Sequence, residues 1–188
     1  MNMVLRPMSR TLPSAVCVQT VLNSIFSIVS NLLKVEAGPD KGAIWHFGDP
    51  VKEQRALAEG KAWADLSHLE IVAIKGVDRL RWLHDLTTQH LETFSGGWSS
   101  GLILDHLGHI EHQFLIFDAL DSSETSWLIV DVDRATPLID YLKKMQFSLR
   151  VEVRDASTEK SLLRVPGLTD DLGGPFQLIN RGEIPNFE

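Results

Sequence analysis

The stretch SGLILDHLGHIEHQFLIFDAL, residues 100–120, contains two apolar runs on either side of the short polar sequence DHLG. Two such runs joined by a polar segment with a glycine predict a β-hairpin. We expect Gly108 to supply the positive φ of the turn, because glycine adopts this conformation at little steric cost. The hairpin indicates that the sheet is antiparallel.

Regular elements are expected on both sides of the hairpin. Asp49 followed by Pro50 is a typical helix start, and Gly60 is a plausible end for that helix. Further patterns predict a strand over 69–76, a helix over 77–86, a strand over 126–132, a helix over 136–147 and a strand over 148–156. This order predicts an α+β fold with a mostly antiparallel sheet and flanking helices.

Two of these helices carry specific expectations. Thr136 is expected to be the N-cap of the helix over 136–147, and Pro137 its first helical residue, as with Asp49 and Pro50. The aromatic residue Trp82 is expected to contribute to packing rather than to ligand stacking. The helix over 77–86 is expected to pack through four residues at helical spacing, which are Val77, Leu80, Leu83 and His84.

Composition limits the classes of function. The chain has 188 residues, a formal net charge of −7 and a single cysteine, Cys17. An acidic chain does not attract phosphate backbones, so no direct nucleic-acid binding is expected. One thiol cannot form an internal disulfide, which favours a reducing compartment, and we expect the cytoplasm.

The chain divides into three parts by composition. Residues 1–33 carry only two charges, Arg6 and Arg10, and the stretch from 11 to 33 has none. Polar residues interrupt every window long enough to span a bilayer, so we expect a poorly ordered extension and no membrane segment. Residues 34–160 form the expected α+β domain. Residues 161–188 begin like a strand and then become rich in Gly and Pro, as at the start of a truncated following segment.

Three histidines near the turn, His106, His109 and His112, raise the possibility of a metal site. On a helix this spacing would bring ligands together. In a hairpin, however, positions 109 and 112 point to opposite faces of the strand, and position 106 lies across the turn. We therefore expect solvated hairpin histidines and no metal. Nothing in the sequence matches G-x-S-x-G, a P-loop or G-x-G-x-x-G, and no catalytic residue is assigned.

Three strings together resemble a known family. ADLSHLEIVAIKGVDRLRWLHDLTTQHL, GLILDHLGHIEH and DYLKKMQFSLRVEVRD occur in the order and spacing of the YgfZ/GcvT folate-binding family. The resemblance covers roughly residues 35–160 and is closest to the YgfZ-like branch of actinobacterial type. It implies the N-terminal part of the aminomethyltransferase folate-binding fold, a tripartite ring around a tetrahydrofolate cavity. This chain would supply the first part and some of the second.

The resemblance also implies site residues. In the aminomethyltransferases the string that matches LTTQH ends in an aspartate, and here that position is His90. A neutral imidazole brings no negative charge, so His90 can line a pterin pocket without supporting aminomethyl transfer. A histidine that only packs at the helix end is the alternative. The residues expected to contact folate are Thr88, Gln89, His90, Ser100, Leu102 and Asp105.

The resemblance leaves two functions open, in addition to an incomplete domain that binds nothing. One is a non-catalytic folate-binding protein of the YgfZ type, linked to iron–sulfur cluster maintenance or tRNA modification. Its expected partners are a small-molecule folate and iron–sulfur proteins or tRNA-modifying enzymes. The other is a tetrahydrofolate-dependent aminomethyltransferase of the glycine-cleavage type. The KGC string of YgfZ-type proteins and the family's C-terminal barrel are not found in this sequence, so we expect folate binding to be weak or lost.

Overall fold

A computed structural model describes residues 33–38, 40–59, 61–165 and 176–181. The expected N-terminal extension lies outside the described residues except for its last position. The expected C-terminal segment is described only over 161–165 and 176–181.

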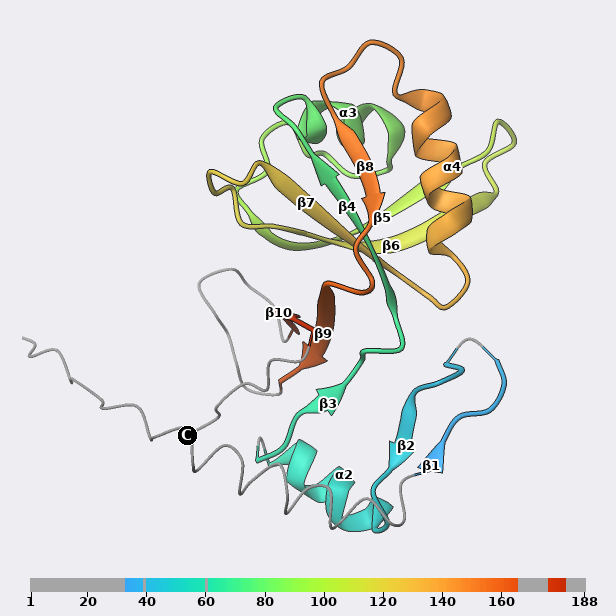
Figure 1. Ribbon diagram of the computed structural model, residues 1–188, viewed down its shortest axis with the longest axis vertical. Helices are drawn as coiled ribbons and strands as arrows, with labels where there is room; N and C mark the ends of the chain where they lie inside the picture. The colour runs from blue at the N-terminus through green and yellow to red at the C-terminus, as the bar shows by residue number, and fades with distance from the viewer. Residues whose placement is uncertain (1–32, 39, 60, 166–175, 182–188) are drawn as a thin grey trace, which may run out of the picture.

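A five-stranded antiparallel sheet forms the body of the molecule (Figure 1). Its strands are β4 (Glu70–Lys75), β5 (Gly97–Leu104), β6 (Ile110–Asp118), β7 (Thr125–Val130) and β8 (Glu152–Asp155), in the order β5-β6-β7-β4-β8. Every neighbouring pair is antiparallel. The predicted α+β class with a mostly antiparallel sheet is therefore confirmed.

The predicted hairpin is formed by β5 and β6. Gly101 lies opposite Phe114 in the register, and Gly108 has a φ of 86° at the turn. The turn closes with a backbone hydrogen bond of 2.9 Å from Asp105 N to His109 O. The local sequence was sufficient for this prediction because hairpin geometry depends mainly on the turn residues.

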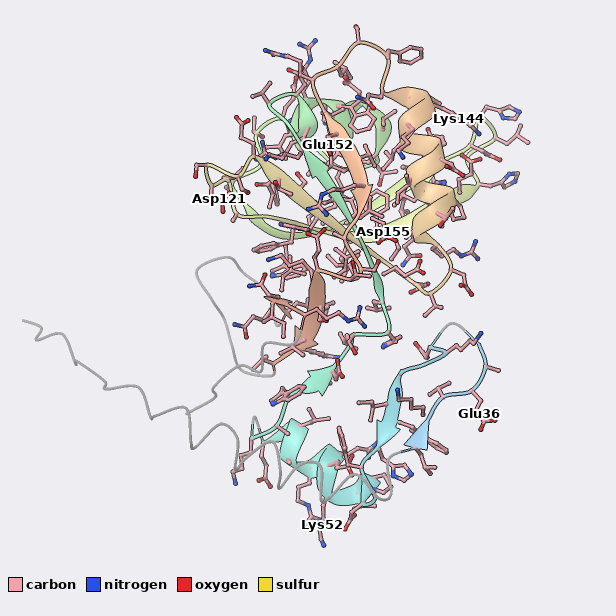
Figure 2. The ribbon with its side chains drawn as sticks, in the orientation of Figure 1. Glu36, Lys52, Asp121, Lys144, Glu152 and Asp155 are labelled. Carbon is pink, nitrogen blue, oxygen red and sulfur yellow. The ribbon has the colours of Figure 1, made fainter. Side chains whose placement is uncertain are left out.

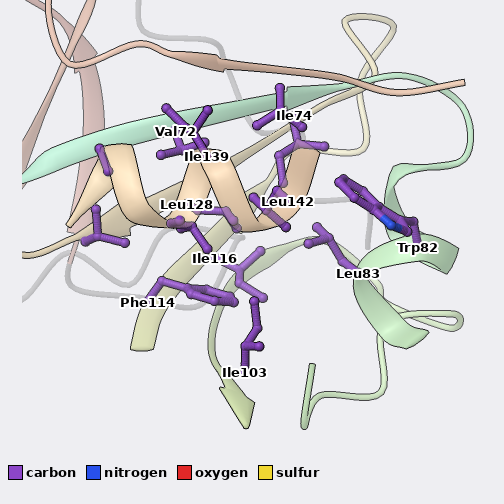
Figure 3. Close-up of a cluster of buried hydrophobic side chains, with 14 of the residues drawn as sticks. Val72, Ile74, Trp82, Leu83, Ile103, Phe114, Ile116, Leu128, Ile139 and Leu142 are labelled. Carbon is purple, nitrogen blue, oxygen red and sulfur yellow. The ribbon is translucent and has the colours of Figure 1, made fainter. Parts of the chain in front are cut away.

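Two helices, α3 (Arg79–Leu86) and α4 (Ala135–Met145), cover one face of this sheet (Figure 1). Figure 3 shows Trp82 and Leu83 of α3 next to Leu142 of α4 in one buried cluster. The Trp82 indole is 2% exposed and donates a 3.1 Å hydrogen bond to the backbone oxygen of Met145, which links the two helices. The expectation that Trp82 serves packing is confirmed. Strand residues in this cluster include Val72, Ile74, Ile103, Phe114, Ile116 and Leu128.

The packing face predicted for α3 is correct at Leu83, which is fully buried, and wrong elsewhere. The buried residues of this helix are Arg79, Trp82 and Leu83, whereas Val77 precedes the helix and is 50% exposed. The face is rotated because Arg79 turns inward to a buried carboxylate on β6, Asp118. A hydrophobic pattern gives no sign of such an ion pair.

The start of α4 also differs from the prediction. The helix begins at Ala135, its N-cap position is Arg134, and neither Thr136 nor Pro137 serves in the expected role. The backbone N–H groups of Arg134 and Ala135 donate instead to Oε2 of Glu70, at 3.0 and 2.7 Å. A carboxylate from β4 therefore caps this helix and also interacts favourably with its dipole.

The opposite face of the sheet packs against a second, three-stranded sheet. Strand β9 (Lys160–Arg164) lies between β10 (Phe176–Asn180) and the short β3 (Ala64–Asp65). Leu162 of β9 joins the buried cluster on this face. Leu163 and Arg164, which follow the predicted domain boundary at residue 160, are thus paired with Asp65 and Ala64 inside the predicted domain.

The remaining elements are β1 (Leu33–Lys34), β2 (Ile44–His46) and α2 (Pro50–Ala58). The predicted helix start is confirmed, since Pro50 is the first residue of α2 and Asp49 Oδ1 accepts a 3.1 Å hydrogen bond from Lys52 N. None of the residues of α2 is buried. Among the described residues, no helix is long and apolar enough to cross a membrane.

Candidate functional site

The loop after α3 carries three of the six expected ligand contacts, Thr88, Gln89 and His90. The helix ends because Thr87 turns to an extended conformation, with φ −118° and ψ 166°. The backbone N–H of Thr88 then donates a 3.0 Å hydrogen bond to the oxygen of Leu102, which lies on the edge strand β5. This bond brings two of the expected site residues together and fixes where the loop runs.

A pair of histidine rings occupies this loop. The rings of His84 and His90 meet edge to face, with centroids 4.7 Å apart and planes at 87°. Nδ1 of His84 lies 3.2 Å from Gln89 O and 3.4 Å from Leu91 N. This one nitrogen can accept from Leu91 N–H when it is unprotonated, or donate to Gln89 O when it is protonated.

His90 itself is exposed, while the nearby Leu91 is 1% exposed and anchors the loop in the core. His84 is half-buried in the last turn of α3, and its ring contacts the His90 ring. The sequence placed His84 on the packing face and missed this contact. The sequence signal for this contact was the position of His84 in the last turn of the helix, because side chains in the last turn can contact the loop that follows the helix.

Ser100 and Leu102 lie on β5, two residues apart, and therefore on the same face of the sheet. Ile103 belongs to the helix-side core, so Ser100 and Leu102 face the opposite side, together with Trp98. Ser100 is exposed and Leu102 is half-buried. The side chains of these two residues thus lie on the face away from α3, although the backbone of Leu102 touches the His90 loop.

Trp98 was not predicted as a site residue. Its ring packs 4.6 Å from the ring of Phe117 and 5.5 Å from that of Phe176. Its indole N–H is buried and has no hydrogen-bond partner within the described part of the chain. A buried donor without an acceptor is unfavourable, so an acceptor supplied by a ligand would stabilise it. The sequence signal for Trp98 was its position two residues before Ser100, which places both side chains on the same face of the strand.

Asp105 serves the hairpin turn. Its Oδ1 accepts hydrogen bonds of 2.8 Å from the backbone N–H groups of both Leu107 and His109, and its Oδ2 lies 2.9 Å from Nδ1 of His109. These bonds, led by the one from the His109 backbone, lower the pKa of the Asp105 carboxyl. Its acceptor oxygens are therefore engaged within the turn.

The other hairpin histidines are separate from one another. His106 is exposed, and His112 is half-buried with its ring 5.4 Å from that of Tyr141. Burial lowers the pKa of His112. Over the described ranges, no group of three or more His, Cys, Asp or Glu side chains is placed to hold a metal ion.

Comparisons with known proteins relate the chain to one class of enzyme. No protein-family model matches the sequence. An aminomethyltransferase from Chloroherpeton thalassium is 28% identical over 116 residues, which are 61% of this chain and 32% of that protein. This chain therefore spans about a third of the length of that curated relative.

A solved structure agrees with this similarity. The glycine cleavage system aminomethyltransferase T from Bartonella henselae superposes with a TM-score of 0.56 at 14% identity, covering 76% of this chain and 38% of that one. At this identity the likeness concerns the fold. The sequence and the fold thus agree with the expected resemblance at the level of the aminomethyltransferases, and the chain has an aminomethyltransferase-type fold over the portion that matches.

Proposed function

We propose that the chain is part of a folate-binding protein of the YgfZ-like branch that does not transfer aminomethyl groups. The observation that carries the proposal is the exposed His90, on a loop fixed to the edge of an aminomethyltransferase-type sheet. The resemblance implies that aminomethyltransferases have an aspartate at this position. The wider role in iron–sulfur cluster maintenance or tRNA modification, with the corresponding protein partners, belongs to the same proposal.

The chemistry of His90 supports a binding role over catalysis. An aspartate stays negatively charged at neutral pH and can stabilise positive charge that develops on a ligand. A neutral imidazole offers one donor and one acceptor but no charge, and a protonated imidazole would repel a cation. His90 can therefore orient a polar ring through hydrogen bonds, while electrostatic stabilisation of a cationic transition state is lost.

The His90 loop and the strand β5 both offer hydrogen-bonding groups of the kind that a reduced folate can use. A pterin ring is flat and carries acceptor nitrogens and a carbonyl. The buried Trp98 indole N–H lacks an acceptor, and the Ser100 hydroxyl is exposed on the same face of β5. Because Trp98 and Ser100 lie on the face of β5 away from α3, His90 is the residue of this loop that would contact tetrahydrofolate, which supplies the one-carbon chemistry in enzymes that use it. Because a ligand site normally buries most of its ligand, we expect weak binding by this portion of the fold.

The sequence similarity to an aminomethyltransferase supports a second candidate, a tetrahydrofolate-dependent aminomethyltransferase. The two candidates differ in what His90 permits. Under our proposal the protein with His90 is inactive in a reconstituted glycine-cleavage assay. Aminomethyl transfer by the unmutated protein would decide for the second candidate.

Binding can be tested by nuclear magnetic resonance, which detects weak ligands. Tetrahydrofolate is titrated into the wild-type chain, into His90→Asp and into His106→Asp, a control that makes the same substitution at an exposed hairpin histidine. We expect amide shifts at residues 87–91 and along β5 in the wild type and the control, and an altered affinity in His90→Asp. Shifts confined to other regions, or none, would contradict the proposal.

A further inference from the structure

A cavity of about 340 Å³ lies away from the His90 loop. The residues that line it come from several separate segments and include Lys34 of β1, Lys41 of the β1–β2 turn, His68 between β3 and β4, and Arg181 directly after β10. The lining shares no residue with the candidate folate site. Its volume falls within the range of about 300 to 1,000 Å³ that is usual for small-molecule sites.

The cavity is strongly cationic in a chain whose net charge is −7. Among the described residues, neither Lys34 nor Lys41 forms an ion pair. The guanidinium of Arg181 donates to the backbone oxygens of Ser157 and Ser67, the second at 3.3 Å. Carbonyl oxygens hold the guanidinium in place but leave its positive charge uncompensated.

One carboxylate, that of Glu70, also lines the cavity. Its Oε2 accepts the two backbone hydrogen bonds at the start of α4, from Arg134 and Ala135. Its charge is therefore directed to the positive end of a helix dipole. The lining retains two ammonium groups and one guanidinium against this single carboxylate.

His68 supplies an independent indication of a ligand. Its Nδ1 is buried and has no hydrogen-bond partner within the described residues. Buried polar atoms in folded proteins nearly always have a partner, and an exception requires an explanation. His68 lines the cavity, and a small movement of its ring would let this nitrogen donate a hydrogen bond to an oxygen of a bound anion.

We propose that this cavity binds the oxyanion group, phosphate or carboxylate, of a small molecule. Lys34 and Lys41 supply charge, Arg181 fixes one wall, and His68 Nδ1 donates the directional hydrogen bond. Ammonium groups bind either kind of oxyanion as point charges. The site extends beyond the proposed folate function and does not depend on it.

Isothermal titration calorimetry with pyrophosphate and with citrate, on the full chain at low ionic strength, tests the proposal. The double variant Lys34→Gln/Lys41→Gln removes two charges from the cavity. Its control, Lys143→Gln/Lys144→Gln, removes two charges from the exposed side of α4, where Figure 2 shows Lys144. We expect saturable binding that weakens about tenfold or more in the cavity variant and stays nearly unchanged in the control.

A neutral variant, His68→Phe, separates a built site from general surface charge. Loss of affinity in His68→Phe, with its thermal midpoint close to that of the wild type, would support the directional hydrogen bond. Preference for pyrophosphate would identify a phosphate ligand, and preference for citrate a carboxylate ligand. The proposal is overturned if neither probe binds saturably, or if the cavity variant and the α4 control lose equal affinity.

Discussion

The substitution Asp118→Ala should destabilise the protein more than any change at an exposed ion pair. Asp118 is 1% exposed and accepts bonds from Arg79 Nε at 2.7 Å, Arg79 Nη2 at 3.1 Å, Ser126 Oγ at 2.6 Å and Leu120 N at 2.7 Å. Removing the carboxylate leaves the Arg79 guanidinium charged, buried and unpaired. Breaking a buried pair in this way costs about 3 to 5 kcal/mol.

This loss of free energy of unfolding is measurable in two ways. Urea unfolding followed by tryptophan fluorescence should show an earlier midpoint with a similar slope. For a chain of this size, about 2 to 4 °C of thermal midpoint per kcal/mol gives a decrease of roughly 6 to 20 °C. Because Arg79 is only 6% exposed, added salt should screen little of the difference.

A double variant separates the cost of a stranded charge from the net value of the pair. Arg79→Met/Asp118→Leu replaces both partners with apolar side chains, which is often close to neutral for a buried pair. We expect it to recover most of the stability that Asp118→Ala loses. A loss below about 1 kcal/mol in Asp118→Ala, the value typical of an exposed pair, would refute the reasoning.

Three further predictions follow from local geometry. Hydrogen bonds from Arg150 lower the pKa of Asp78 from 3.8 to about 2, so the stability that they contribute is present above pH 3.8 and is lost as the pH falls toward about 2. Acid unfolding curves of Asp78→Asn should lack this loss of stability between pH 3.8 and about 2. Gly76→Ala should destabilise far more than Gly108→Ala in a thermal melt, because a Cβ at Gly76 would lie 2.0 Å from the Arg150 oxygen, whereas Gly108 has open space and incurs only the left-handed strain of about 1 to 2 kcal/mol. Glu70→Ala should lower stability by about 0.5 to 2 kcal/mol through loss of the α4 cap, and equal stability in urea would contradict that role.

Local sequence was sufficient where a structure depends on neighbouring residues. The start of α2 at Asp49 and Pro50 and the hairpin turn at Gly108 were predicted correctly. Each depends on groups within a few positions of one another, because caps and turns satisfy backbone groups locally. Strand β4 followed from apolar patterning in the same way.

For the candidate site, the sequence located the loop but not its surroundings. The resemblance indicated His90, and the end of α3 placed it on a loop. The ring of His84 beneath it, the orphan N–H of Trp98 and the turn role of Asp105 became visible only in three dimensions. The assignment of folate contacts to particular side chains stays a prediction.

The sequence alone determined the kind and order of the main elements from α2 to β8, because these depend on propensity and periodicity, whereas the short strands β1, β2 and β3 and the strand β10 were not predicted. The tertiary structure decided the inward turn of Arg79 toward Asp118, 39 residues away, and the capping of α4 by Glu70, 65 residues before Ala135. It also decided that β9 pairs with β3, through residues such as Arg164 and Ala64 that are far apart in the sequence. Such contacts form between groups that are distant in sequence, and local patterning carries no information about which distant carboxylate, strand or ring will satisfy a given buried group.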